Sequence, residues 1–461
     1  MGETWANGLD LHLDFTGTRV RARLETALRD AVRSGRLAAG TRLPSSRMLA
    51  TDLGVARNTV AEVYTQLVAE GWLLARTGSG TVVAPPPATP PPFTASEPVL
   101  ARPDGPAAFR YDLRPGVPDL SSFPRALWIA AARKALAAAP DLALGYGDPA
   151  GIPALRAALA GYLARARGVA VEPGGANIVI CSGFTHGLAV VCHALRAVGA
   201  GTLAVEEFGY PEHRETAVMA GLRIQPIPVD ANGAAVAAAS GADAMLLTPA
   251  HQFPIGVTLS PGRRRTVAGW EGIVIEDDYD GEFRYDRQPA GAVQALAPDN
   301  VVYCGTASKS LAPGARIGWL VVPPRLLGTV TAALGPGPSA LDQLTLAELI
   351  SSGGYDRQVR RMRLAYRRRR DSLVASLEPL GLRVTGIAAG LHAVVELPST
   401  EREVEAVARG REHGLELLGL GDFAFDASRS QSGLVVGYAR PPQHAYTAAL
   451  ARLRAVLAPG S

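Results

Sequence analysis

Apolar residues recur at helical spacing near the start of the chain and predict three short helices followed by a hairpin. Ser45 or Ser46 suits the N-cap of the second helix, which runs to Leu53, and the third helix runs from about 58 to 70. A glycine-rich turn at 77–80 separates two apolar runs, which is typical of a hairpin. The expected inward positions are Val20, Leu24, Ala27, Leu28, Ala31 and Val32, then Met48, Leu49 and Leu53, then Val60, Val63, Tyr64 and Leu67. Three helices and a small β wing predict a winged helix-turn-helix.

From residue 111 onward, apolar runs of strand length alternate with alanine-rich helical stretches such as 185–197. The runs lie at 177–181, 202–205, 223–226, 244–247, 272–276, 301–304 and 318–322. This alternation predicts an α/β fold with a mostly parallel central sheet. In such sheets, ligands bind beyond the carboxyl ends of the strands.

Proline marks the boundary between these two parts. Nine prolines lie between residues 85 and 106, and a stretch of this kind forms an extended, semi-rigid spacer. We therefore expect a small domain at 10–84, a proline-rich linker at 85–108 and a larger domain at 109–461.

Composition narrows the class of protein. Hydrophobic residues make up 48% of the 461 residues and charged residues 19%, as in an ordinary folded protein. The net charge of +4 excludes a histone-like chain that binds nucleic acid over its whole surface. Three cysteines exclude a disulfide framework and a cysteine-rich zinc site, and we expect no metal site. Because neither a secretory signal pattern nor a membrane-length apolar stretch is present, we expect a cytoplasmic protein.

Only two of the 46 basic residues are lysines, Lys134 and Lys309. Lys309 follows a strand-like run and lies among small residues, whereas Lys134 lies in an alanine-rich helix. Asp277 and Tyr279 follow another run, and the turn at 181–185 opens a helix whose N–H groups suit a phosphate. An amine, a carboxylate and an anion site at three strand ends predict a site for pyridoxal 5′-phosphate (PLP). In such a site the lysine forms a Schiff base and the carboxylate pairs with the pyridinium nitrogen.

The smaller part carries the first family resemblance. The segments GTRLPSSRMLA at 40–50 and LGVARNTV at 53–60 strongly resemble the GntR-type DNA-binding domain. The resemblance implies that the third helix enters the major groove and that DNA is contacted by Arg47, Arg57, Asn58, Thr59 and Gly78. Arg57 can bond guanine bidentately, and Gly78 lets the wing approach the minor groove. The family often has Ser or Thr at the position of Ala56, so we expect one hydroxyl contact to be lost.

The larger part is similar to fold-type I aminotransferases. The supporting segments are YGDPAG at 146–151, EFGYP at 207–211, TPAHQFPIG at 248–256 and SKSLAPGARIG at 308–318. This fold after a GntR-type domain is the arrangement of the MocR subfamily, and the chain is identified as a member of it. The resemblance implies a smaller C-terminal α+β subdomain and a homodimer.

The resemblance implies a role for each matching residue. Lys309 corresponds to the Schiff-base lysine, Asp277 to the partner of the pyridinium nitrogen, and Tyr279 to the donor to the phenolate oxygen. Tyr210 corresponds to the aromatic residue that stacks on the ring, and Tyr146 to a tyrosine that reaches the phosphate of the partner subunit. The implied phosphate ligands are Ser182, Gly183 and Phe184 in the turn, with the side chains of Thr306 and Arg316.

Two positions depart from the aminotransferase pattern. Phe253 stands where many of these enzymes have an asparagine beside the pyridine oxygen, and His251 or Gln252 could replace that asparagine. Val435 stands where an arginine usually holds the substrate α-carboxylate, while Arg440 lies five positions later. We therefore expect at most partial transamination chemistry.

These observations predict a PLP-dependent transcriptional regulator that senses PLP or a small amine or amino-acid-like effector. Its expected partners are operator DNA, a second copy of the chain and the effector. Two alternatives remain: a genuine aminotransferase with an accessory DNA-binding domain, and a regulator whose larger domain is only a dimerisation scaffold. Eight arginines between 357 and 370 form either the surface of a long helix, which we favour, or a track for the DNA backbone.

Overall fold

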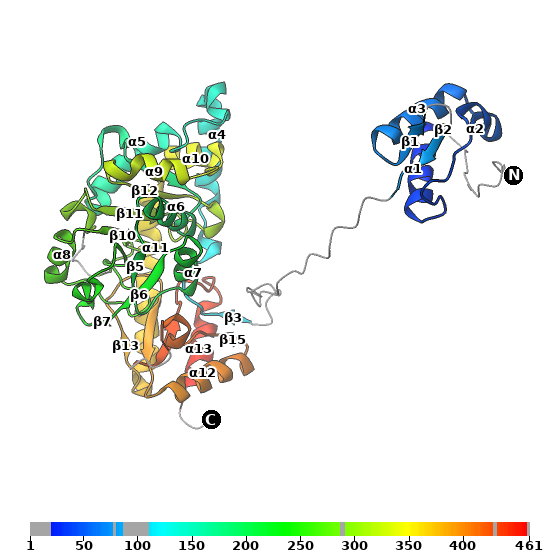
Figure 1. Ribbon diagram of the computed structural model, residues 1–461. Helices are drawn as coiled ribbons and strands as arrows, with labels where there is room; N and C mark the ends of the chain where they lie inside the picture. The colour runs from blue at the N-terminus through cyan, green and yellow to red at the C-terminus, as the bar shows by residue number, and fades with distance from the viewer. Residues whose placement is uncertain (1–19, 77–79, 86–109, 286–290, 427–430, 459–461) are drawn as a thin grey trace. The chain divides into compact units, whose positions relative to one another are not determined.

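The computed structural model describes residues 20–76, 80–85, 110–285, 291–426 and 431–458. The chain divides into two compact units, Met1–Pro103 and Asp104–Ser461, whose elements are labelled in Figure 1. The linker expected at 85–108 lies almost wholly outside the described residues, so its conformation stays a prediction.

Within residues 20–85, the smaller unit contains three helices and a hairpin. The elements are α1 Val20–Arg33, α2 Ser46–Leu53, α3 Arg57–Ala69, and the antiparallel strands β1 Leu73–Arg76 and β2 Gly80–Val83. Ser45 caps α2 by accepting a hydrogen bond from the Met48 N–H, and Gly54 ends the helix in the left-handed region with φ of 66°. These elements confirm the winged helix-turn-helix fold.

The core of the smaller unit contains the apolar positions that the helical spacing indicates, with one exception. Leu24, Leu28, Leu49 and Val60 are buried, but Met48 is 44% exposed. The prediction that Met48 faces inward is wrong. Successive helical residues are rotated by about 100°, so a helix that buries Leu49 turns its preceding neighbour toward solvent.

Within its described residues, the larger unit is built on a seven-stranded sheet in the order β4-β12-β11-β10-β9-β5-β6. The strands are β4 Ile178–Cys181, β5 Thr202–Glu206, β6 Arg223–Ile227, β9 Ala244–Leu247, β10 Ile273–Asp277, β11 Val301–Thr306 and β12 Gly318–Val321. β12 runs in the opposite direction to the other six strands of this sheet. The expectation of a mostly parallel sheet is therefore confirmed.

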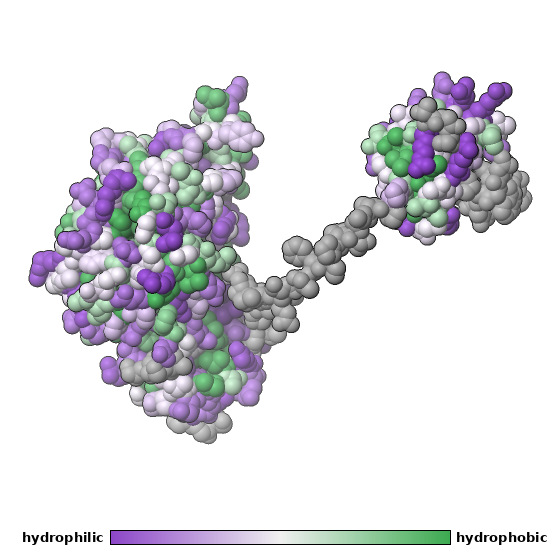
Figure 2. All heavy atoms as spheres, in the orientation of Figure 1, coloured by the Kyte–Doolittle hydropathy of each residue, from purple (hydrophilic) through white to green (hydrophobic). Residues whose placement is uncertain are grey.

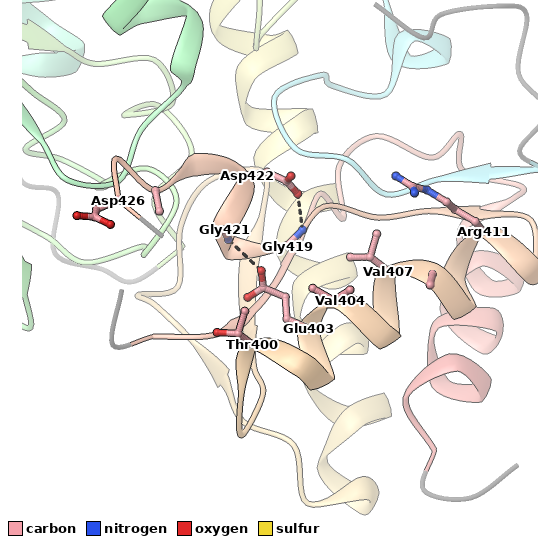
Figure 3. Close-up of a pocket in the computed structure, with 11 residues that line it drawn as sticks. Thr400, Glu403, Val404, Val407, Arg411, Gly419, Gly421, Asp422 and Asp426 are labelled. Carbon is pink, nitrogen blue, oxygen red and sulfur yellow. Dashed lines mark hydrogen bonds between the residues drawn. The ribbon is translucent and has the colours of Figure 1, made fainter. Parts of the chain in front are cut away.

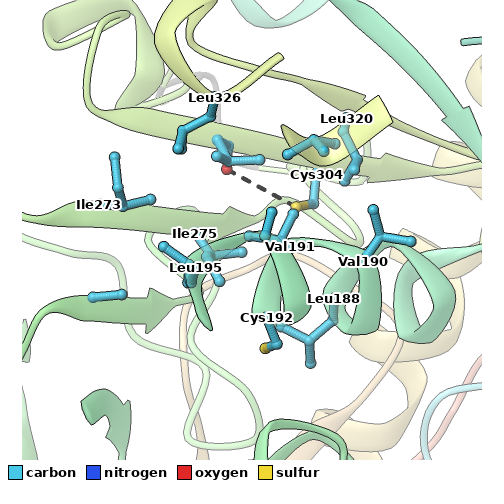
Figure 4. Close-up of a cluster of buried hydrophobic side chains, with 14 of the residues drawn as sticks. Leu188, Val190, Val191, Cys192, Leu195, Ile273, Ile275, Cys304, Leu320 and Leu326 are labelled. Carbon is cyan, nitrogen blue, oxygen red and sulfur yellow. Dashed lines mark hydrogen bonds between the residues drawn. The ribbon is translucent and has the colours of Figure 1, made fainter. Parts of the chain in front are cut away.

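Helices cover both faces of this sheet (Figure 1). They are α4 Arg125–Ala138, α5 Pro153–Arg167, α6 Phe184–Ala197, α7 Pro211–Met219, α8 Pro261–Ala268, α9 Pro324–Ala333, α10 Ala340–Ser351 and α11 Gly354–Leu377. Alternate residues of a strand point to opposite layers. Cys181 of β4 therefore packs in the core shared with α6 and α9, whereas Ile180 packs in the core shared with α5 and α10. Figure 4 shows the first core, where Val191 and Leu195 of α6 lie near Ile275 of β10.

A smaller α+β subdomain follows α11. The antiparallel strands β13 Val384–Thr385, β14 Ala393–Glu396 and β16 Gly433–Val436 pack with α12 Thr400–Glu412 and α13 Tyr446–Leu457. The segment after the proline-rich stretch joins this subdomain, because β3 Tyr111–Asp112 pairs in parallel with β15 Leu415–Glu416. The remaining short strands are β7 Val229–Asp230 and β8 Gly233–Ala234.

Among the described residues, no helix is both long and apolar enough to cross a membrane. On the face of the larger unit in view, apolar patches are interspersed with polar residues (Figure 2).

Candidate cofactor site and DNA-binding surface

The carboxyl ends of three strands lie at one edge of the sheet and carry the predicted cofactor residues. Asp277 ends β10 and pairs with Cys304 of the neighbouring parallel strand β11, which leads into Lys309. β4 runs in the same direction, two places along the sheet, and leads into Gly183. The structure therefore brings the carboxylate, the amine and the small-residue turn to the same edge.

The amine of Lys309 is hydrogen-bonded to a backbone carbonyl. Its Nζ donates a hydrogen bond to the Gly116 carbonyl at 2.6 Å. Burial lowers the pKa of Lys309, and the negative charges of Asp277 and Asp280 oppose that shift. A lysine whose amine loses its proton more readily is a better nucleophile toward an aldehyde.

Asp277 is 6% exposed, and its Oδ1 has no hydrogen-bond partner among the described residues. Burial raises the pKa of Asp277 well above its ordinary value, an effect that Lys309 opposes. A buried carboxylate oxygen without a donor is costly unless a ligand supplies one. A protonated pyridine nitrogen is a donor of the right kind, so the residue fits PLP.

The turn after β4 fits a phosphate. Gly183 caps α6 with φ of 94°, and a Cβ there would meet nothing within 4 Å, so there is open space beside the residue that precedes the helix. His186 fixes the turn, because its Nδ1 accepts from the Ser182 N–H at 3.0 Å. Its Nε2 contacts the Leu334 carbonyl at 3.1 Å, so both ring nitrogens have structural partners.

The remaining predicted phosphate ligands approach the same edge. Thr306 ends β11, and its Oγ1 lies 2.9 Å from the Ser308 hydroxyl, a neighbour that the sequence analysis did not select. Arg316 is exposed and adopts φ of 50° just before β12. The Phe184 ring lies 4.7 Å from the ring of His213, which was not predicted from the sequence. Burial lowers the pKa of His213 to about 3, and the positive charge of Lys309 adds to this shift.

Tyr210 lies against an aromatic wall. Its ring stacks on Phe253 at 4.2 Å with an interplanar angle of 11°, and Phe423 meets it edge-on at 5.5 Å. Val435 of β16 is fully buried in the same apolar cluster. The structure thus shows Tyr210 stacked on Phe253, and its predicted contact with the cofactor ring stays a prediction.

Tyr279 contacts His251 rather than standing alone. Its hydroxyl lies 3.1 Å from His251 Nδ1 and donates to the His251 carbonyl at 3.2 Å. His251 Nδ1 also lies 2.7 Å from Asp280 Oδ2. Gln252, the other replacement considered for the missing asparagine, is used elsewhere, since its Nε2 donates to the Phe208 carbonyl at 3.0 Å.

Two predicted residues do not join this group within one chain. Tyr146 is fully exposed, in the stretch that follows the short helix η2 Asp141–Leu144. Arg440 pairs with Asp112 at 2.7 Å, and Asp112 also pairs with Arg114 at 2.9 Å.

In the smaller unit, the predicted DNA-contacting arginines differ from Arg21 and Arg29 in their partners. Arg47 on α2 and Arg57 at the start of α3 are exposed and form no ion pair with any described residue. By contrast, Arg21 pairs with Glu62 at 3.0 Å and Arg29 with Glu70 at 2.7 Å. Unpaired guanidinium groups at the start of a helix-turn-helix recognition helix are available for DNA.

The other predicted DNA contacts lie beside Arg57, except one. Asn58 is exposed and Thr59 is half-buried in the first turn of α3. Gly78 falls outside the described residues. Arg42, which the sequence analysis did not select, lies over the hairpin, with its Nε 3.5 Å from the point where a Gly80 Cβ would stand.

Comparison with known proteins identifies both units. Residues 20–83 match the gntR family of bacterial regulatory proteins, and residues 116–416 match the class I and II aminotransferases. The pyridoxine biosynthesis regulator PdxR of Corynebacterium glutamicum is 32% identical over 91% of this chain and 92% of its own. The probable rhizopine catabolism regulatory protein MocR of Rhizobium meliloti is 34% identical over 76% of this chain and 75% of its own.

The chain belongs to the MocR subfamily of GntR-type transcriptional regulators. Solved structures support the fold of its larger unit. The kynurenine aminotransferase of Pyrococcus horikoshii, solved in complex with PMP, matches with a TM-score of 0.67 at 23% identity, over 75% of this chain and 90% of that one. The larger unit of this MocR-type regulator therefore has the fold-type I aminotransferase fold.

The arginine-rich segment of the regulator forms α11. Six of its arginines are exposed: Arg357, Arg360, Arg361, Arg363, Arg367 and Arg368. Arg369 is buried and pairs with Asp119 at 2.7 Å, while Arg370 donates to the Gly386 carbonyl at 3.2 Å. A long helix with an exposed arginine face agrees with the surface interpretation, and the interpretation as a DNA-backbone track is untested.

A separate hollow of about 520 Å³ lies in the C-terminal subdomain, between α12 and the segment 419–426 (Figure 3). Its carboxylates hold the backbone. Glu403 accepts from the N–H groups of Gly421 and Gly433 at 3.0 and 2.8 Å, and Asp422 accepts from that of Gly419 at 2.8 Å. These bonds make the hollow part of the fold rather than a second candidate for the cofactor.

Proposed function

We propose that this regulator binds PLP covalently at Lys309 and that PLP itself, or a small amine that reacts with it, is the signal. The observation that carries the proposal is the buried, partnerless Oδ1 of Asp277 at the same strand edge as the Lys309 amine. When bound, PLP supplies an aldehyde and an electron-withdrawing ring. Asp277 would pair with the ring nitrogen, and Tyr279 would donate to the phenolic oxygen.

The other residues would hold the phosphate and the ring face. The N–H groups of Gly183 and Phe184 and the hydroxyls of Ser182 and Thr306 would donate hydrogen bonds to the phosphate, with Arg316 providing positive charge. Tyr210 would cover one face of the ring.

Two lysines make the covalent link easy to test. Borohydride reduction of the PLP-loaded protein followed by peptide mapping should label Lys309. Lys309→Ala should abolish the visible absorption band. Lys134→Ala is the matched control, because Lys134 is exposed and pairs with Glu348 on the surface. A label at Lys134, or a band that survives Lys309→Ala, would refute the assignment.

We favour regulation over enzymatic turnover because of the apolar wall around Val435. A buried valine can neither pair with nor orient an α-carboxylate. The name of the relative PdxR, a regulator of pyridoxine biosynthesis, supports PLP as the effector. A steady-state assay with common α-amino acids and 2-oxo acids distinguishes the alternatives. Turnover of about 1 s⁻¹ or more would favour a genuine aminotransferase. A purified protein without a visible band would favour a dimerisation scaffold.

Operator binding is proposed to depend on Arg57 for sequence and on Arg47 for attachment. Arg57→Ala should cost about 1–3 kcal/mol per half-site and relax one base position. Arg47→Ala should weaken all sequences alike and reduce the dependence of binding on salt. For PLP to act as the signal, it must favour one arrangement of the units, so titration with PLP should shift operator affinity. DNA binding in turn implies a cytoplasmic location.

A homodimer is also proposed. Large apolar side chains are exposed beside Tyr146, with Leu142 87% and Leu144 53% exposed, and Leu136 of α4 and Leu341 of α10 are about half exposed. Exposed apolar residues gathered in this way mark an interaction surface. If a second copy covers it, Tyr146 would reach the partner's phosphate. Sedimentation of the PLP-loaded protein as a stable monomer would contradict this.

A further inference from the structure

A chain of three buried or half-buried side chains leads from the protein interior to the hydroxyl of Tyr279. Asp280 Oδ2 lies 2.7 Å from His251 Nδ1, and that nitrogen lies 3.1 Å from the Tyr279 hydroxyl. The side chains of His251 and Asp280 are 2% and 1% exposed. Neither residue has been assigned a role in the phosphate turn, and Asp280 acts on Lys309 only through its charge.

We propose that His251 and Asp280 are positioning residues that orient the Tyr279 hydroxyl toward the phenolic oxygen of bound PLP. The inference rests on the proposed PLP binding and extends it to residues to which no role has been assigned. Asp280 fixes the tautomer and the rotation of the imidazole by accepting its Nδ1 proton. The same Nδ1–H faces the Tyr279 oxygen at 3.1 Å, and the Tyr279 hydroxyl donates to the His251 carbonyl at 3.2 Å. When PLP binds, the hydroxyl proton would turn from this carbonyl to the phenolic oxygen, while the imidazole keeps the tyrosine oxygen in place.

The neighbouring residues offer no substitute for His251. The amide of Gln252 is occupied, since its Oε1 accepts from the Ile255 N–H at 3.1 Å and its Nε2 donates to the Phe208 carbonyl at 3.0 Å. Phe253 has no polar side-chain atom. Within 251–253, His251 therefore provides the side chain that holds the tyrosine.

His251 and Asp280 pack so closely against residue 390 that only a glycine fits there. Gly390 has φ of +77°, and a Cβ there would lie 2.4 Å from His251 Cε1 and 2.5 Å from Asp280 Oδ2. The pair is thus seated against bare backbone, which limits the rotation of the imidazole. Such close seating is what a hydrogen-bond chain of defined direction requires.

A metal ion is the competing use of these groups, because ligand atoms of His251, Asp280 and His392 lie within 4.8 Å of one another. However, His392 Nε2 contacts the Pro254 carbonyl at 3.2 Å, and His251 Nδ1 already contacts both Asp280 and Tyr279. His251 Nδ1 and His392 Nε2 thus already have hydrogen-bond partners within the protein, and neither needs a metal ion. The His392 ring lies 5.2 Å from that of His251, and the Tyr279 hydroxyl is hydrogen-bonded to His251, which makes His392 a matched control.

The test measures affinity for two ligands on the full-length protein. PLP has the phenolic oxygen, and 3-deoxypyridoxal 5′-phosphate lacks it. Asp280→Asn and His251→Asn should each weaken PLP binding about tenfold, the effect of one hydrogen bond to a charged group. Both variants should bind the 3-deoxy compound like the wild type, and His392→Asn should bind both ligands like the wild type.

Tyr279→Phe removes only the hydroxyl oxygen and provides the second part of the experiment, a double-variant comparison. If the two residues act through that oxygen, Asp280→Asn should add no further loss of PLP affinity in the Tyr279→Phe background. An equal loss for both ligands, or full additivity in the double variant, would show a merely structural role and overturn the inference. An equal effect of His392→Asn would overturn it in favour of a metal site. Failure of the wild type to bind PLP would instead refute the proposed function.

Discussion

Two sides of the candidate site differ in the kind of side chain that they present. At the strand edge, Lys309, Asp277 and Tyr279 are polar groups held by backbone, burial or a buried histidine. On the second side, Val435 and Phe253 belong to a cluster of apolar and aromatic side chains, against which the Tyr279 ring also packs. The first side suits a charged heterocycle, and the apolar side chains of the second offer no partner to a carboxylate.

The difference separates binding of the cofactor from its use in catalysis. Transamination needs the substrate held so that the bond to be broken is correctly oriented on the ring, and a bidentate arginine usually contributes that orientation. A site with the first side and without the second can bind PLP and report its presence. This is the property that a regulator needs, because ligand binding has only to favour one conformation over another.

The largest expected effect comes from placing a charge in the apolar wall. Val435→Arg should destabilise the larger unit by about 3–5 kcal/mol, because the guanidinium would be buried without a partner. The unfolding transition of the larger unit in denaturant measures this loss of stability. Val435→Met, which keeps the position apolar but adds volume, should cost about 1–3 kcal/mol. A Val435→Arg variant that is as stable as the wild type and gains transaminase turnover would show that the wall is open to a carboxylate.

The next effect concerns the polar side and has two opposite parts. Asp277→Asn should weaken PLP binding about 100-fold, because a buried charge pair with the ring nitrogen is lost. Without PLP, the same variant should be more stable than the wild type at neutral pH. Burial raises the pKa of Asp277 well above its ordinary value. The carboxyl's contribution to folding stability is therefore present below that ordinary value and is lost as the pH rises toward the raised pKa.

Thermal unfolding at several pH values checks the second part. The stability difference between Asp277→Asn and the wild type should vanish near pH 4, roughly the ordinary pKa of an aspartate, and grow as the pH rises. A variant that is less stable than the wild type at every pH would mean that the carboxylate supports the fold rather than the ligand.

The sequence predicted the frame of this site better than its fine contacts. Runs such as 244–247 and 301–304 are continuously apolar because the strands are buried on both faces, so β9 and β11 could be located from pattern alone. The contact of Lys309 with the Gly116 carbonyl could not, because a backbone acceptor 193 residues away leaves no trace in residue type. Asp280 was likewise missed, since its partner His251 comes from a different loop.

Gly116 provides a smaller test of the polar side. It has φ of +92°, and a Cβ there would lie 2.4 Å from the Tyr210 hydroxyl. Gly116→Ala should therefore displace Tyr210 and the carbonyl that holds Lys309, and weaken PLP binding about tenfold, or about 1.4 kcal/mol. Fluorescence titration with PLP measures the affinity. Gly209→Ala is the matched control, because a Cβ at Gly209 meets nothing within 4 Å and should leave the affinity unchanged. Equal affinities for wild type and Gly116→Ala would remove Gly116 from the site.

The smallest expected effect comes from changing Glu206, whose carboxylate contacts Gln252, the residue before Phe253. Its Oε2 accepts from the Thr248 hydroxyl at 2.5 Å and from Gln252 Nε2 at 3.3 Å, and burial raises its pKa to about 7. Because the pKa is raised on folding, this carboxyl favours the folded state most at a pH below about 4.5 and loses that contribution as the pH rises to about 7. Glu206→Gln keeps one acceptor oxygen and has no charge to bury. It should be more stable than the wild type by about 1 kcal/mol at pH 8 and equal to it near pH 4.

Glu276 supplies the contrast that makes this last measurement decisive. Its pKa is also raised to about 7, but its two oxygens accept from the Val293 and Gln294 N–H groups, each at 2.8 Å. Glu276→Gln would set an amide N–H₂ against a backbone N–H and should destabilise the protein at every pH. If Glu206→Gln behaves in the same way, the carboxylate charge of Glu206 is needed to hold Gln252, and the apolar wall depends on a buried anion behind it.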